Sequence, residues 1–78
     1  MTHRKAINLA VGSKIKQLRL DLALTQEQLA ERANSHPNYI GAIERGEKSP
    51  SVVKLVEISI ALNCMVSDLV SGEPFPGY

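Results

Sequence analysis

Few side chains in this sequence could carry covalent chemistry or bind a metal ion. His3 and His36 are its two histidines and lie far apart in the chain, and Cys64 is its single cysteine. The sequence has no glycine-rich phosphate loop and no HExxH motif. A single cysteine excludes an internal disulfide and a multi-cysteine zinc site, and it suits a reducing cytoplasm. We therefore expect no enzyme, metal site, cofactor or small-molecule ligand, and we interpret Cys64 as a structural thiol.

The most informative stretch reads TQEQLAERANSHPNYIGAIER. Thr25 and Gln28 have the spacing of a capping box, which predicts the start of a helix. Asn34 tolerates the left-handed conformation that ends a helix. Pro37 is favoured in the first turn of the next helix, and Gly46 is placed to end it. The pattern therefore predicts two short helices joined by a tight turn.

This stretch resembles the helix-turn-helix of the lambda-repressor/Cro-like (Xre) family of bacterial and phage regulators. The resemblance covers residues 9–70, and the succession of TQEQLAERA, YIxxIERG and a PS pair is a specific signature. Asn34 and Ser35 depart from the family pattern, which usually has glycine and then an aliphatic residue in the turn. The resemblance implies an all-α fold, a compact five-helix lambda-repressor-like DNA-binding domain over residues 1–78. The matching residues are Arg19, Gln26, Leu29, Ala30, Ala33, Tyr39, Ile40, Ile43, Glu44, Arg45, Gly46, Pro50 and Ser51.

The resemblance also implies roles for individual residues. In that family the positions of Arg19 and Glu44 form a partly buried salt bridge between the first helix and the recognition helix. A helix-turn-helix places the start of its second helix in the major groove, where an Asn amide can pair with adenine, so Asn38 is the strongest expected reader. The expected base-contacting residues, taken as the exposed positions of this helix, are His36, Pro37, Asn38, Gly41 and Ala42. The expected backbone-contacting residues are Thr25, Gln26, Tyr39, Arg45, Lys48 and Ser49.

Some of these roles have alternatives. His36 could simply cap the helix, and Arg45 and Lys48 could be ordinary solvated charges. The net charge of +1 is weak for a nucleic-acid binder. Residues 1–48, however, hold eight Lys or Arg and five Asp or Glu, whereas residues 49–78 hold one and three. The half that contains the motif is therefore the positive half.

Apolar residues that recur every three or four positions predict a helix before the motif, over residues 6–22. Gly12 lies within it, and a close contact with another helix would explain a glycine there. Residues 1–5 are interpreted as a flexible N-terminus, and a basic arm on DNA is the alternative. The apolar residues of this helix are Ile7, Val11, Ile15, Leu18 and Leu22.

A fourth helix is predicted over residues 52–62, with Ser51 as its N-cap, and a short fifth helix over residues 65–70. The core-facing residues of the fourth helix are expected to be Val52, Leu55, Ile58, Ser59 and Leu62. A second apolar set lies on another face, and a small monomer has little reason to expose it. We interpret it as a dimer or partner surface, against a broad core face as the alternative. This surface comprises Val53, Val56, Ile60, Met65, Val66 and Val70.

Residues 73–78 form a C-terminal tail in which Phe75 and Tyr78 either fold back or lack order. The sequence has no apolar run of membrane-spanning length and no clear signal peptide. The resemblance implies a cytoplasmic, sequence-specific regulator that binds double-stranded DNA as a homodimer on a palindromic operator, as a repressor or a restriction–modification controller. The alternative is an antitoxin or adaptor that binds a protein partner through its fourth and fifth helices.

Overall fold

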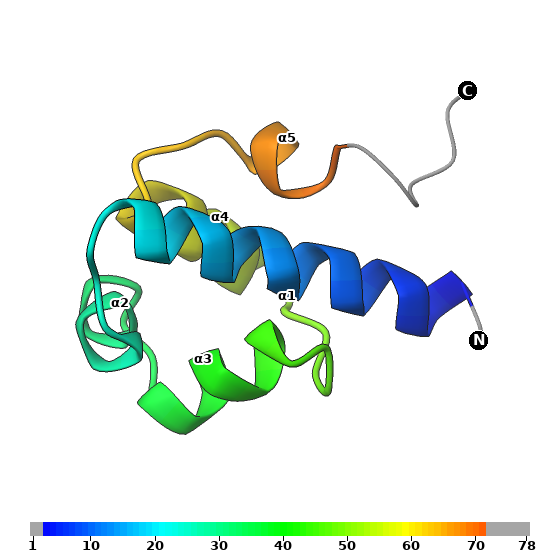
Figure 1. The fold of residues 1–78 in the computed structure, drawn as a ribbon, viewed down its shortest axis with the longest axis horizontal. Coiled ribbons are helices and arrows are strands. Elements are labelled where there is room, and N and C mark those ends of the chain that lie inside the picture. The colour runs from blue at the N-terminus through cyan, green and yellow to red at the C-terminus, as the bar shows by residue number, and fades with distance from the viewer. Residues whose placement is uncertain (1–2, 72–78) are drawn as a thin grey trace.

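The computed structural model describes residues 3–71, which form five α-helices and no strand (Figure 1). The expected all-α fold is confirmed. Predictions for residues 1–2 and 72–78, including those for Phe75 and Tyr78, lie outside the described residues. The helices are α1 (His3–Asp21), α2 (Gln26–Arg32), α3 (Pro37–Glu44), α4 (Val52–Ala61) and α5 (Val66–Leu69).

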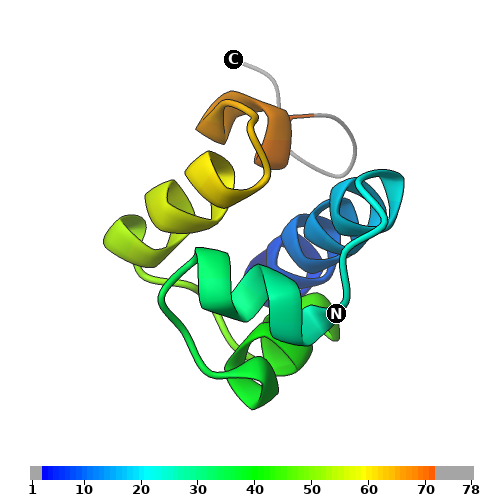
Figure 2. The same cartoon turned by 90° about the vertical axis from the view of Figure 1, so that its left-hand side faces the viewer.

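The long helix α1 lies between the other elements, with α3 on one side and α5 on the other (Figure 1). Viewed from the end, α2 and α3 form one side of the molecule and α4 and α5 another (Figure 2). All five helices contribute aliphatic residues to one core, as the scarcity of aromatic residues requires. The largest fully buried side chains are Ile15, Leu29, Ile40, Ile43, Ile58 and Leu69.

Three expectations about α1 and α4 are corrected by the structure. Helix α1 begins at His3, so residues 3–5 are helical instead of flexible; Arg, Lys and Ala favour the helix and nothing interrupts it. The row of apolar residues on α1 is buried only at its centre, since Ile7 and Leu22 at its two ends are 37% and 45% exposed. Val52 is 79% exposed and lies outside the core. It precedes the buried Ile58 by six positions, which places it about 120° around the helix.

Gly12 makes the close helix contact that its position predicts. A Cβ atom built on it would lie 2.1 Å from the carbonyl oxygen of Ile43 and 2.8 Å from that of Glu44. The backbones of α1 and α3 therefore touch directly at the C-terminal end of α3. A side chain at this position would separate the two helices.

The first four helices end in the same way, with a left-handed residue just after the helix. At the end of α3, the amide of Gly46 donates to the carbonyl of Ile43 at 3.0 Å, and the amide of Glu47 donates to the carbonyl of Ala42 at 2.9 Å. This is a Schellman motif, which turns the chain sharply back on itself. The expected helix stops at Asn34 and Gly46 are confirmed. The left-handed residues are Ala23, Asn34, Gly46 and Asn63.

We predict that Gly12→Ala destabilises the protein by about 2 kcal/mol, although alanine is the better helix former, because the new methyl group overpacks the contact with α3. The measurement is the free energy of unfolding in urea. Ser13→Ala is the matched control, since Ser13 is exposed in the same turn; it should change stability by less than about 0.5 kcal/mol. A Gly12→Ala protein as stable as the wild type would contradict the contact.

Candidate nucleic-acid interface

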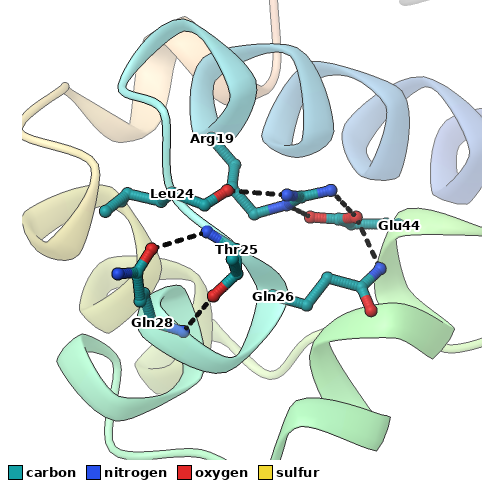
Figure 3. Close-up of polar contacts among 6 residues, drawn as sticks. All are labelled: Arg19, Leu24, Thr25, Gln26, Gln28 and Glu44. Atoms are coloured by element: carbon teal, nitrogen blue, oxygen red, sulfur yellow. Dashed lines mark hydrogen bonds and ion pairs between the residues drawn. The ribbon is translucent and has the colours of Figure 1, made fainter.

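Helix α2 begins with the predicted capping box, which the structure confirms (Figure 3). The backbone amide of Thr25 donates to Oε1 of Gln28 at 2.8 Å, and the amide of Gln28 donates to Oγ1 of Thr25 at 3.0 Å. Both side chains are therefore used within the helix start. The amides of Gln26 and Glu27 precede the first intrahelical hydrogen bond and point out of the end of α2.

Arg19 and Glu44 form a buried ion pair between α1 and α3 (Figure 3). Nε of Arg19 donates to Oε2 of Glu44 at 2.7 Å, and Nη2 donates to Oε1 at 3.1 Å. The remaining terminal nitrogen, Nη1, donates to the carbonyl of Leu24 at 2.8 Å. The two side chains are only 8% and 3% exposed, and a buried pair of charges needs this degree of hydrogen bonding to offset its loss of water.

Gln26 joins this cluster from the start of α2. Its Nε2 donates to Oε1 of Glu44 at 3.0 Å (Figure 3). One carboxylate therefore connects α1, α2 and α3. Gln26 was expected to meet a phosphate through its side chain or its backbone amide. The side chain is directed to Glu44, and the backbone amide is the group that faces outward at the helix end.

Two residues with polar side chains are exposed at the start of α3. His36 is the N-cap, and its Nδ1 accepts from the amide of Asn38 at 3.1 Å. The capping alternative for His36 is therefore what the structure shows. The side chains of His36 and Asn38 are exposed, and Pro37 and Tyr39 are half-buried.

Gly41 and Ala42 are buried, so the expectation that they are exposed positions of α3 is wrong. Gly41 is covered by two long side chains: a Cβ atom there would lie 3.0 Å from Nη1 of Arg45 and 3.4 Å from Oε1 of Gln26. Ala42 is 7% exposed and lies where the chain turns back after α3, with its carbonyl bonded to the amide of Glu47. Helical spacing alone predicts neither the side chains that cover Gly41 nor the chain turn that buries Ala42.

Arg45 forms an exposed ion pair with Glu47. No role was predicted for Glu47 from the sequence. Nε and Nη2 of Arg45 contact Oε2 and Oε1 of Glu47 at 2.7 and 3.1 Å. The hydrogen bond that Arg45 donates to Glu47 raises the pKa of Arg45 and lowers the pKa of Glu47, so both residues stay charged at neutral pH. Lys48 and Ser49, which follow, are exposed.

Lys54 of α4 holds the turn between α2 and α3. Its Nζ donates to the carbonyls of Ala33 and Asn34, both at 3.0 Å, and lies 2.9 Å from Oε1 of Glu57. The family's aliphatic turn residue is Ser35 here, and the turn is instead fixed by this distant ammonium group. A contact across 20 residues has no signature in the local sequence.

The second apolar set, on α4 and around α5, is exposed except for Val66, which is half-buried. Val53 and Ile60 are 70% and 72% exposed, so the alternative of a broad core face is wrong for this side of α4. Met65 is 69% exposed, whereas Val56 and Val70 are 40% and 38% exposed. We call Val53, Val56, Ile60, Met65, Val66 and Val70 the apolar stripe.

Other chemical features of the described residues are few. Within residues 3–71, no three His, Cys, Asp or Glu side chains are grouped so that they could hold a metal ion, and no helix there is long and apolar enough to cross a membrane. Burial, and then the nearby charge of Asp68, raises the pKa of the Cys64 thiol. This half-buried thiol packs against the core and remains protonated.

Comparison with known proteins places this geometry in a family. The helix-turn-helix family model HTH_3 matches residues 15–69. The chain is 42% identical over 65 residues to the immunity repressor protein of Bacillus phage phi105, which covers 83% of this chain and 45% of that protein. It is also 38% identical over 65 residues to control protein C.BamHI of Bacillus amyloliquefaciens. This match covers 82% of this chain and 80% of that protein. The chain thus spans less than half the length of the phage repressor.

A solved structure agrees with these relatives. The master regulator for biofilm formation SinR, solved in complex with DNA, superimposes with a TM-score of 0.75 and 32% identity, covering 78% of this chain and 98% of that chain. The family model includes the capped helix start, the turn and α3 described above. The resemblance seen in the sequence is therefore confirmed, and this chain belongs to the HTH_3 family of helix-turn-helix proteins.

Proposed function

We propose that this chain is a sequence-specific regulator of transcription that binds double-stranded DNA. The observation that carries the proposal is the exposed start of α3, together with the outward-facing amides at the start of α2, which Gln26 ties to the end of α3 through the Glu44 carboxylate. Relatives named as a repressor and a control protein, and a similar fold solved with DNA, support it. Such a regulator acts where DNA is accessible, which in a bacterium is the cytoplasm.

In this proposal the start of α3 enters the major groove. Asn38 reads a base edge through its amide, which suits adenine. The Nδ1 of His36 accepts the capping bond, so its Nε2 carries the proton and can donate to a base or a phosphate. Pro37 lies beside them and supplies an apolar contact. Gly41 and Ala42 are left out because they are buried.

Phosphates of the DNA backbone are contacted on both sides of this helix. The end of α2 supplies backbone amides at Gln26, next to Thr25, which suits an anion. Tyr39, Lys48 and Ser49 follow along the path of α3 and the loop after it, and Arg45 joins them. These contacts position the protein and carry no sequence information.

We also propose that the regulator is a homodimer. The apolar stripe is the surface available for a second copy, and two-fold symmetry doubles both the DNA contacts and the positive field. The centres of the two half-sites should lie about 34 Å apart on one face of the duplex. The same stripe would serve an adaptor that binds a different protein, and sedimentation of the pure protein separates the two, since self-association without a partner favours the homodimer.

The proposed function is tested by selecting bound sequences from a randomised duplex pool and measuring the salt dependence of binding. We expect a palindrome with half-sites one helical turn apart and a steep fall in affinity with salt. Bound sequences without enrichment would contradict specific reading. The absence of binding at micromolar protein would contradict the proposal altogether.

Two substitutions separate base reading from backbone contact. Asn38→Ala should weaken binding to the selected sequence by about 1–3 kcal/mol and leave binding to random DNA nearly unchanged. Lys48→Ala should weaken binding to all sequences and flatten the salt slope by about one unit. Both are measured by fluorescence anisotropy of labelled duplexes at several salt concentrations. Equal losses on the selected and the random duplex for Asn38→Ala would show that Asn38 does not read a base.

A further inference from the structure

The ion pair between Arg45 and Glu47 lies at the C-terminal end of α3, where the proposed DNA-binding loop begins. Gly46 separates the two residues, and its left-handed conformation, φ 76°, turns the chain so that their side chains meet. The pair is bidentate, with contacts of 2.7 and 3.1 Å, and its side chains are 59% and 57% exposed. It is therefore a well-formed pair in contact with solvent.

The guanidinium of Arg45 is also folded back over α3. Its third nitrogen, Nη1, would lie 3.0 Å from a Cβ atom at Gly41, and Oε1 of Gln26 would lie 3.4 Å from the same point. The absence of a side chain at Gly41 makes this position possible. Arg45 therefore lies against the helix that is proposed to read DNA, beside the start of α2.

The contacts of Glu47 occupy one of the two edges through which the Arg45 guanidinium can bind a phosphate, and Nη1 of the other edge lies against Gly41. Arginine binds phosphate through two parallel N–H bonds, in the same geometry that it uses for a carboxylate. Glu47 holds Nε and Nη2, which form one such edge. A phosphate that approaches this edge meets a carboxylate already in place.

We propose that Glu47 sets the affinity of this protein for DNA by holding the phosphate-binding edge of Arg45 until a DNA phosphate replaces it. The proposal rests on the proposed function, because it assigns a regulating residue to the same interface. An exposed ion pair is weak, so the exchange can occur. Each phosphate contact of Arg45 is then made at the loss of the contact with Glu47, and the released carboxylate stays near the DNA and repels it.

The surroundings of the pair explain why one carboxylate has a large local effect. A shallow groove between the start of α1 and the end of α3 is lined by Glu47 together with three basic residues and three others. Glu47 is the only acidic residue that lines it, so a neutral residue there leaves basic side chains as the only charged groups of the lining. The other lining residues are Arg4, Lys5, Asn8, Leu9, Arg45 and Gly46.

The test compares the Glu47→Gln variant with the wild type in binding to a random-sequence duplex. Binding is measured by fluorescence anisotropy at a series of salt concentrations. We expect about three- to tenfold tighter binding at low salt and a salt slope steeper by up to about one unit, because Arg45 then neutralises an additional phosphate. Glu31→Gln is the matched control: Glu31 is exposed on α2, the change in net charge is the same, and we expect less than a twofold effect.

The same substitution made in an Arg45→Gln protein shows whether Glu47 acts on DNA affinity by way of Arg45. In an Arg45→Gln protein, adding Glu47→Gln should produce no further gain. Wild-type protein that binds DNA while Glu47→Gln binds no tighter would overturn the inference, and so would an equal gain in the Arg45→Gln background, which would indicate general repulsion by Glu47. If neither the wild type nor any variant binds a duplex, the proposed function itself fails and this inference fails with it.

Discussion

The carboxylate of Glu44 is the contact on which the rest of this structure depends. It accepts two hydrogen bonds from Arg19 of α1 and one from Gln26 of α2, while Glu44 itself belongs to α3. Three consecutive helices are thereby held at one buried point. A buried charge that loses its partner costs about 3–5 kcal/mol, so the arrangement tolerates little change. This contact fixes the start of α2 against the C-terminal end of α3.

The surrounding packing strengthens the same constraint, and two of the residues proposed to contact DNA take no part in it. Gly12 allows α1 to touch the end of α3, and Lys54 binds the carbonyls of the turn between α2 and α3. Asn38 and Lys48 lie outside these contacts, on exposed surface. The buried contacts therefore set the geometry, and they do not involve the side chains of Asn38 at the helix start and Lys48 in the loop.

The sequence predicted the features that depend on neighbouring residues. The capping box at Thr25 and the helix stops at Asn34 and Gly46 were predictable because each depends on a local conformational preference. The left-handed Ala23 was not, since alanine carries no such signal. Nor was the cover over Gly41, because the side chains that bury it come from another helix and from the end of its own. Within the site, the burial of Gly41 and the contact of Lys54 with the turn depended on such tertiary contacts, whereas the start of α3 did not.

The most direct test of this account is a double-mutant cycle between Arg19 and Glu44, with each residue replaced by methionine and unfolding followed in urea. Each single substitution should lower the free energy of unfolding by about 3–5 kcal/mol, or prevent folding, because an unpaired charge remains buried. The double variant should lose clearly less than the sum, with a coupling of at least about 2 kcal/mol. Strictly additive losses would show that the two residues stabilise the fold independently and would contradict the account.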